Sequence, residues 1–286
     1  MTTTTWRGLW AEAEARLGSR TEARRIVERA SGWEGSDLVL NLERAVPDRA
    51  LPFARAMVER RAAGEPLQYV VGRWGFRRLD LLVDRRALIP RPETETVVEV
   101  ALGELRRLGL DRPPLVADLG TGTGAIALSV ALEVPSARVW ATDVSADALD
   151  LARANLAGLG SRAAPRVSLA HGDWFGALPG ELRGRFDLVV SNPPYVGTGE
   201  RLPAEVAGWE PHEALYSGAT GMEALSALVA GAPTWLARPA ALVVEIAPHQ
   251  QGPAVALARA GGFEDVAVRP DMAGLARTLV GRLGPQ

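Results

Sequence analysis

The sequence contains no cysteine and no lysine. Without cysteine there are no disulfides, thiolate nucleophiles or cysteine-ligated zinc sites. Without lysine there is no Schiff-base lysine and no P-loop lysine, so arginine carries all positive side-chain charge apart from histidine. The three histidines, His171, His212 and His249, are scattered along the chain. We expect them to be surface or loop residues, and we expect no metal.

The charge balance shows no basic excess, because 32 basic residues face 34 acidic ones in 286 residues. A protein that grips duplex nucleic acid normally carries such an excess, so we expect no direct nucleic-acid partner, although a local basic patch remains open. The first six residues lack the regions of a signal peptide, and no apolar run is long enough to span a bilayer. We therefore expect a cytoplasmic protein without a membrane partner.

The first 70 residues are predicted to form helices. Ser19 followed by Glu22 indicates a capping box that opens a helix running to Ala30. Ser36 is predicted to open a helix through Val46, and Pro52 lies in the first turn of another helix that runs to Ala63. Apolar residues recur at helical spacing in the first segment: Trp6, Leu9, Trp10, Ala13 and Leu17. A solvated bundle and a partner-binding domain both fit this pattern.

Residues 71–90 differ in character and are predicted to form a β-hairpin linker. Leu79–Asp84 has the pattern of a strand, and Tyr69–Gly72 is a candidate for a second strand.

From residue 91 to residue 286, predicted helices and strands alternate. Such alternation indicates an α/β domain with a parallel sheet covered on both faces, and ligands bind such sheets at the carboxyl ends of the strands. The predicted helices are Thr94–Leu108, Ala125–Leu132, Ala146–Leu156, Gly221–Ala230 and Ala254–Ala260. The predicted strands are Leu115–Asp118, Arg138–Thr142, Arg166–Ala170, Phe186–Val190, Ala241–Ile246, Phe263–Arg269 and Leu275–Arg282.

Three successive predicted strand ends carry residues suited to a nucleoside ligand. The first is followed by the glycine loop Gly120–Gly124, which lets backbone approach a ligand closely. Asp143, at the end of the next, is placed to accept hydrogen bonds from ribose hydroxyls. Asp173 and Trp174 follow the third and suit the edge and face of an adenine. Taken alone, the glycine loop could also be a NAD site or a plain tight turn. Asp143 and Asp173 could also be ordinary turn or cap aspartates.

The tetrapeptide Asn192-Pro193-Pro194-Tyr195 follows a fourth predicted strand. Proline fixes its own φ and holds the preceding residue extended, so Asn192 and Pro193 are both extended. The Asn192 side-chain oxygen and the Pro193 carbonyl then offer two fixed acceptors to a planar NH2 group, against which Tyr195 packs. Holding both hydrogens directs the nitrogen lone pair and stabilises the charge that grows on nitrogen. A stiff turn is the alternative. Together, the four strand ends favour an S-adenosylmethionine site.

With these motifs in this order, the chain resembles class I (Rossmann-like) S-adenosylmethionine-dependent methyltransferases, and specifically the PrmC/HemK family. Leu88–Glu95 resembles the family's signature before the catalytic domain. Arg77 and Arg78 stand where the family has an aromatic residue and a glycine, so we expect the hairpin to differ in detail. The other matching segments are Gly120–Gly124, Asp143, Gly172–Phe175, Asn192–Tyr195, Glu210–Pro211, Ala214–Leu215, Gly218, Gly221 and Asp271–Arg277.

The resemblance implies a seven-stranded catalytic domain over residues 91–286 and a helical domain over residues 1–70 that recognises the substrate. It implies transfer of a methyl group to N5 of the glutamine in the Gly-Gly-Gln loop of peptide chain release factors. Asn192, Pro193 and Tyr195 would be catalytic, and Asn192–Tyr195 would contact the substrate. The expected cofactor-binding residues are Gly120, Thr121, Gly122, Thr123, Gly124, Asp143, Asp173, Trp174 and Asn192.

Three other functions fit parts of the pattern. An adenine-N6 methyltransferase of nucleic acid needs the same tetrapeptide, because adenine N6 is also a conjugated NH2 group. The acidic pI of about 6.0 and the signature around Pro90 and Pro92 count against it. A non-catalytic adaptor and a NAD(P) oxidoreductase are the others. Arg91 and Glu93 either order a loop over the site or form a salt bridge between domains.

Overall fold

The structure is a computed structural model that describes residues 4–285. The chain forms two compact units. One contains the residues up to Trp74 together with Pro203–Trp209, and the other contains Gly75–Leu202 and the residues from Glu210 onward. The predicted domain boundaries at residues 70 and 90 stay predictions.

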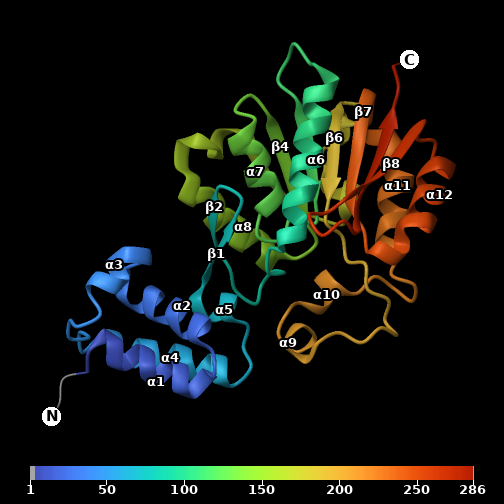
Figure 1. Ribbon diagram of the computed structural model, residues 1–286. Helices are drawn as coiled ribbons and strands as arrows, with labels where there is room; N and C mark the ends of the chain where they lie inside the picture. Colours follow the sequence, from blue (N-terminus) through green and yellow to red (C-terminus); the bar gives the residue numbers. More distant parts are fainter. Residues whose placement is uncertain (1–3, 286) are drawn as a thin grey trace. The chain divides into compact units, whose positions relative to one another are not determined.

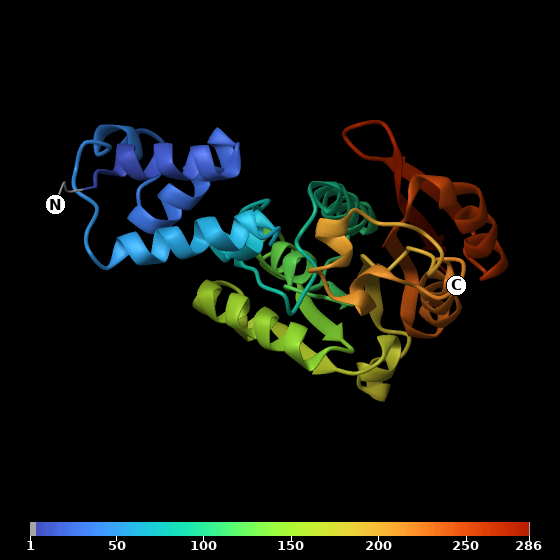
Figure 2. The same cartoon turned by 90° about the horizontal axis from the view of Figure 1, so that it is seen from below.

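The first unit is helical, as its apolar spacing predicts. Figure 2 shows α4 lying alongside α1 and α2. Trp6, Leu9 and Ala13 of α1 are buried, and the Ser19 hydroxyl accepts a hydrogen bond from the Glu22 amide at the start of α2. The helices are α1 (Trp6–Leu17), α2 (Arg20–Ser31), α3 (Gly35–Leu40), α4 (Ala50–Ala62) and α5 (Leu67–Val71).

Two predictions in this unit are wrong. Tyr69–Gly72 is not a strand, because α5 occupies Leu67–Val71 and Gly72 ends it in the left-handed conformation. Three consecutive buried apolar residues suit a short buried helix as well as a strand. The helix predicted from Ser36 to Val46 ends at Leu40, where the Asn41 side chain donates to the Asp37 carbonyl instead of continuing the helix.

Pro203–Trp209, which contains α9 (Ala204–Ala207), belongs to the helical unit although it lies far along the chain. Arg61 of α4 pairs with Glu22 of α2 at 2.8 Å and with Glu205 of α9 at 3.1 Å. One partly buried guanidinium thus ties the late segment to the early helices. The chain therefore enters the helical unit again between the tetrapeptide and Glu210.

A two-stranded sheet pairs β1 (Arg73–Phe76) with β2 (Leu79–Leu82). Arg77, at its turn, has a φ of 49°, a conformation that normally favours glycine. Its guanidinium pairs with Glu133 at 2.6 Å and with Glu99 at 3.0 Å. These ion pairs offset the strain of a non-glycine residue at this position.

The second unit contains a seven-stranded sheet of order β5-β4-β3-β6-β7-β9-β8. β3, β4, β5, β6 and β7 pair in parallel, whereas β9 runs antiparallel to both β7 and β8. The strands are β3 (Leu115–Leu119), β4 (Arg138–Asp143), β5 (Val167–His171), β6 (Phe186–Ser191), β7 (Leu236–Glu245), β8 (Asp265–Pro270) and β9 (Ala276–Leu283). Every predicted strand of this sheet is present, and β9 alone runs in the opposite direction to the other strands of the sheet.

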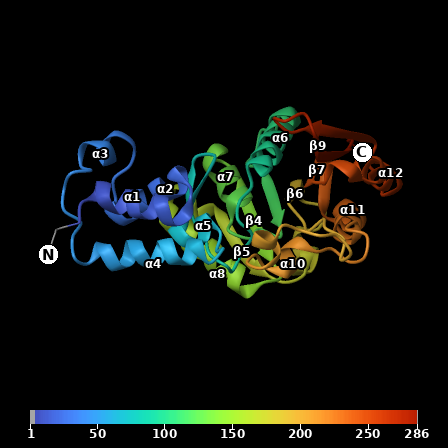
Figure 3. The ribbon, with the colours of Figure 1, turned by 60° about the horizontal axis from the view of Figure 1, so that its bottom comes forward.

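Helices cover both faces of this sheet. Figures 1 and 3 show α6 and α11 on opposite sides of β6 and β7. Val189, Leu242 and Val244 face α11 and α12 in one apolar core. The helices are α6 (Pro92–Leu108), α7 (Ala125–Glu133), α8 (Ala146–Leu159), α10 (His212–Leu215), α11 (Glu223–Trp235) and α12 (Gln251–Ala260); single 3-10 turns are η1 (Gly160–Arg162), η2 (Ala164–Arg166), η3 (Trp174–Ala177), η4 (Gly180–Leu182) and η5 (Pro248–Gln250).

The role of Ser19 as the N-terminal cap of α2 can be tested by substitution. Ser19→Ala removes the hydroxyl that accepts from the Glu22 amide, so we expect the free energy of unfolding to fall by about 1 kcal/mol. Ser36→Ala is the matched control, because Ser36 is exposed inside α3 and caps nothing there. We expect it to change the free energy by less than about 0.5 kcal/mol in urea titrations. Equal losses in both variants would contradict the capping role of Ser19.

Candidate active site

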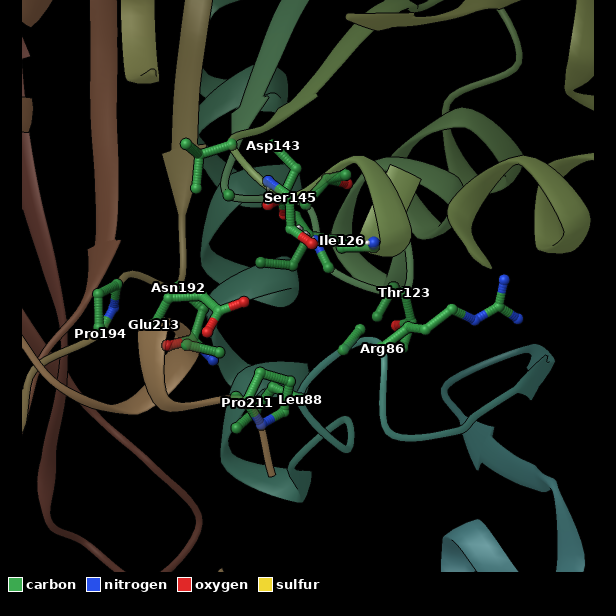
Figure 4. A pocket seen from close by; sticks show the side chains of 18 of the residues that line it. Arg86, Leu88, Thr123, Ile126, Asp143, Ser145, Asn192, Pro194, Pro211 and Glu213 are labelled. Carbon is green, nitrogen blue, oxygen red and sulfur yellow. Dashed lines mark hydrogen bonds between the residues drawn. The ribbon is translucent and has the colours of Figure 1, made fainter. Parts of the chain in front are cut away.

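One pocket lies where β3, β4, β5 and β6 end, and its space is about 960 Å³ including the open mouth. Figure 4 labels side chains that lie at or after the ends of β3, β4 and β6 around it, together with Leu88 and Pro211. The predicted site residues that line it are Gly120, Thr121, Gly122, Thr123, Asp143, Asp173, Trp174, Asn192 and Pro194. Gly124, Pro193 and Tyr195 do not line it. The individual roles predicted for all twelve residues stay predictions.

The glycine loop is built on the end of its neighbouring strand. The amides of Gly120 and Thr121 both donate to the carbonyl of Thr142, at 2.9 and 2.8 Å. Gly120, Gly122 and Gly124 have φ values of 74°, 55° and 85°, which side-chain-bearing residues rarely adopt. The loop therefore needs glycine at these three positions and turns its backbone toward the pocket.

Asp118, in β3, holds this loop by hydrogen bonds. It is fully buried, and its Oδ2 accepts from the Thr121 hydroxyl at 2.6 Å and from the Ala127 amide at 3.0 Å. Its Oδ1 is also buried and makes no hydrogen bond to any described residue. Burial raises the pKa of Asp118 to about 7, against which the Thr121 hydrogen bond acts.

Asp143 joins the glycine loop to the next helix. Its Oδ2 accepts from the Gly122 amide at 2.8 Å, and its Oδ1 accepts from the Ser145 amide at 2.9 Å. Burial raises the pKa of Asp143 above its ordinary value. A carboxylate oxygen has room for a second donor, so Asp143 can hold the loop and still accept from a ligand hydroxyl.

Trp174 forms a flat wall of the pocket. A Cβ built on Gly120 would lie 3.5 Å from its ring, so the ring covers the glycine loop at contact distance. Trp174 itself has a φ of 41°, which is unusual for a bulky residue and costs conformational energy. The strain places the indole beside Asp173, which also lines the pocket.

The tetrapeptide stands at the end of β6, opposite Asp143 in Figure 4. The Asn192 Nδ2 donates to the Thr94 hydroxyl at 3.1 Å, while Pro194 reaches the pocket. The Tyr195 hydroxyl lies 3.5 Å from Glu245 Oε1. Burial raises the pKa of Tyr195 to about 12, so the phenol stays neutral.

Gln250 holds the backbone behind the tetrapeptide. Its Nε2 donates to the Tyr195 carbonyl at 3.1 Å and to the Gly221 carbonyl at 3.0 Å. A Cβ on Gly221 would lie 2.4 Å from the Tyr195 carbonyl oxygen, and its φ is 76°. Only glycine fits there, so the last residue of the tetrapeptide is fixed from two sides.

The segment before α6 also lies at the site. Arg91 pairs with Glu210 at 2.5 Å, and the same carboxylate accepts from the Ile89 amide at 3.1 Å. Both partners belong to the second unit, so the alternative of a salt bridge between domains is wrong for Arg91. The ion pair orders the Leu88–Pro90 stretch that lines the pocket.

Sequence reasoning missed Thr94 and Glu245 as partners of the tetrapeptide. Thr94 lies inside the signature segment, and Glu245 is the last but one residue of the predicted strand Ala241–Ile246, so both positions carried a signal. Their meeting depends on strand order, because they are 151 residues apart in sequence. The pocket lining also includes Arg86, Ser145 and Glu213, which no motif singled out.

Comparison with known proteins decides the family. Residues 9–72 match the model of the PrmC N-terminal domain, and residues 105–206 match that of the methyltransferase small domain. The release factor glutamine methyltransferase of Deinococcus radiodurans is 38% identical over 95% of this chain and 96% of its own length. This chain belongs to the release factor glutamine methyltransferase family. The Xylella fastidiosa (strain 9a5c) member is 46% identical over 80% of each chain.

Solved structures support the fold of this family member. A methyltransferase from Pyrococcus furiosus matches with a TM-score of 0.52 at 19% identity, covering 73% of this chain and 90% of that one. The catalytic domain of hMettl16, in complex with an RNA hairpin, matches with a TM-score of 0.57 at 14% identity, covering 92% and 94%. The predicted class I methyltransferase fold with a helical N-terminal region is confirmed. Within residues 4–285, no helix has the length and apolar character needed to cross a bilayer.

The buried Asp118 predicts a specific pH dependence of stability. Its folded-state pKa of about 7 exceeds the ordinary 3.8, so the folded state binds the extra proton and stability falls as pH rises between these values. We expect the unfolding free energy of the wild type, relative to that of Asp118→Asn, to fall by about 2–3 kcal/mol from pH 5 to pH 8. Urea titrations of both proteins measure this difference. Parallel pH curves would contradict the raised pKa.

Proposed function

We propose that this protein transfers the methyl group of S-adenosylmethionine to the side-chain amide nitrogen N5 of the glutamine in the Gly-Gly-Gln loop of peptide chain release factors. Membership of the release factor glutamine methyltransferase family supports this reaction. The structural observation that supports this reaction best is that Asn192, the glycine loop, Asp143 and Trp174 all line the same pocket.

The chain's own residues suit S-adenosylmethionine. Gly120 and Gly122, both left-handed, bring backbone without a side chain to the pocket, and the Trp174 ring lies at contact distance from Gly120. Asp143 offers acceptors for ribose hydroxyls, and Trp174 offers a face for adenine. When bound, the cofactor supplies a methyl group already activated on a sulfonium.

The protein's part is to align the amide nitrogen. Asn192 Oδ1 and the Pro193 carbonyl accept the two hydrogens of the glutamine NH2, and Tyr195 packs on the amide plane. This directs the nitrogen lone pair, and alignment of this kind is worth roughly 7–11 kcal/mol of barrier. A general base is unnecessary before attack, because the proton leaves only once nitrogen is positively charged.

The rest of the assignment follows from this reaction. The helical unit, predicted as residues 1–70, recognises the release factor, and residues 71–90 link it to the catalytic domain. The protein works in the cytoplasm and needs no direct contact with nucleic acid. The adenine-N6 alternative is not favoured, because its supporting tetrapeptide is shared with the glutamine reaction and the close relatives are named for the latter.

Transfer of labelled methyl from S-adenosylmethionine tests the substrate. We expect label on purified release factor, and none on a factor whose Gly-Gly-Gln glutamine is changed to alanine or on duplex DNA. Label on DNA alone would indicate that the methylated group is an adenine amino group rather than a glutamine amide. Absence of label on all three would contradict the proposed function.

Asn192→Ala tests the aligning acceptor. The variant loses one of the two acceptors for the NH2 hydrogens, so we expect kcat to fall by about 10²–10³-fold, by analogy with the loss of one oxyanion-hole donor. We expect the affinity for S-adenosylmethionine, measured by calorimetry, to fall much less than kcat, because Asn192 is only one of the predicted cofactor-binding residues and the glycine loop and Asp143 are untouched. A variant with near-full kcat would contradict the role of Asn192.

A further inference from the structure

A chain of hydrogen bonds links the end of β7 to the tetrapeptide. The Thr94 hydroxyl donates to Glu245 Oε2 at 2.7 Å, and the Thr94 oxygen itself accepts from Asn192 Nδ2 at 3.1 Å. Thr94 comes from α6, Glu245 ends β7, and Asn192 follows β6. Thr94 is 4% exposed and Glu245 is 1% exposed, so water does not compete for these bonds.

The direction of each bond follows from the number of hydrogens. A carboxylate only accepts, so the single hydroxyl hydrogen of Thr94 points to Glu245. The Thr94 oxygen is then left as an acceptor and must receive a hydrogen from Asn192. The amide NH2 of Asn192 is thereby turned to Thr94, and its Oδ1 faces the other way.

We propose that Thr94 and Glu245 are positioning residues that fix the side-chain amide of Asn192, so that its oxygen rather than its nitrogen meets the substrate NH2. This inference rests on the proposed function of Asn192. An asparagine amide fits a site almost equally well after a 180° turn of its plane, because oxygen and NH2 have the same size. In the turned form two NH2 groups would face each other and the substrate lone pair would lose its direction.

The groups around Glu245 make this arrangement sensitive to pH. Glu93 of α6 and Arg277 of β9 act on it by charge, the latter favouring the carboxylate, and the Tyr195 hydroxyl faces its Oε1. Burial, with Glu93 acting in the same direction, outweighs the Thr94 bond, Arg277 and the Tyr195 hydroxyl, and raises the pKa of Glu245 to about 7.

Protonation of Glu245 would remove the constraint on the orientation of the Asn192 amide. A protonated Glu245 can donate to the Thr94 oxygen, which frees the Thr94 hydrogen for Asn192 Oδ1 and permits the turned amide. The Asn192 amide is therefore held in the productive orientation at pH values above the pKa of Glu245, and this constraint weakens below that pKa. We expect kcat to rise with pH through a step near 7.

Two variants of Thr94 separate positioning from packing. Thr94→Val keeps the shape but has no hydroxyl, so we expect kcat to fall roughly 10- to 100-fold while the affinity for S-adenosylmethionine stays within about twofold. Thr94→Ser keeps the hydroxyl and should retain kcat within about threefold. Full kcat in Thr94→Val, or equal losses in both variants, would overturn the inference.

A double-mutant cycle shows whether Thr94 acts through Asn192. In the Asn192→Ala background there is no amide to orient, so Thr94→Val should lower kcat by less than about twofold. Independent, multiplying losses would overturn the inference.

The pH profile tests Glu245. Glu245→Gln does not titrate, and its NH2 group can donate to the Thr94 oxygen as a protonated carboxyl would, so we expect kcat at pH 8 to fall to about the low-pH value of the wild type and to show no step near pH 7. Asp118→Asn is the control, because Asp118 also has a pKa of about 7 and its variant should keep the step. A step that persists in Glu245→Gln, or disappears only in Asp118→Asn, would overturn the role of Glu245.

Nuclear magnetic resonance gives a readout without turnover. The chain has only three asparagines and four glutamines, so the side-chain amide signals of Asn192 can be assigned by their absence in Asn192→Ala. We expect these signals to titrate near pH 7 in the wild type and not in Glu245→Gln. Signals that do not titrate would overturn the inference, whereas a wild type that titrates but methylates no release factor would overturn only the proposed function.

Discussion

The parallel pairing of β3 with both β4 and β6 is the constraint on which the site depends. β3 lies between these two strands, so their carboxyl ends meet at one edge of the sheet. The Thr142 carbonyl at the end of β4 accepts from two amides of the glycine loop, and the Ser191 hydroxyl at the end of β6 donates to the Leu119 carbonyl at 2.6 Å. The tetrapeptide and the glycine loop are therefore fixed relative to each other by strand register rather than by loop packing.

The same edge carries two buried acids whose charge is costly. Asp118 is the last but one residue of β3 and Glu245 is the last residue of β7. Both are buried, and both have pKa values raised to about 7. A buried carboxyl that served only stability would be replaced by an apolar residue at little cost. Each instead orders a hydroxyl, Thr121 in the glycine loop and Thr94 beside Asn192. Burying these two carboxyl groups costs stability, and in return each one fixes the direction of a hydrogen bond at the pocket.

Sequence reasoning predicted what depends on local pattern. The glycine loop, Asp143 and the tetrapeptide stand at predicted strand ends, and all seven predicted strands of this sheet are present. Tyr69–Gly72 was misassigned because a five-residue buried helix and a strand share the same apolar run. Glu245 and Thr94 were missed because no local pattern reports that β7 lies next to β6, or that α6 begins beside them.

The support behind the tetrapeptide explains why it can act as a fixed template. Proline restrains Asn192 and Pro193 along the chain, Thr94 restrains the Asn192 amide, and Gln250 restrains the Tyr195 carbonyl. Acceptors held in this way need no reorganisation when the substrate arrives, which is where electrostatic catalysis gains most. A more mobile loop with the same residues would have to lose conformational freedom in each catalytic cycle. In the proposed reaction, the rigidity of the strand end therefore serves the chemistry, and Thr94 and Gln250 contribute by holding the groups that face the substrate.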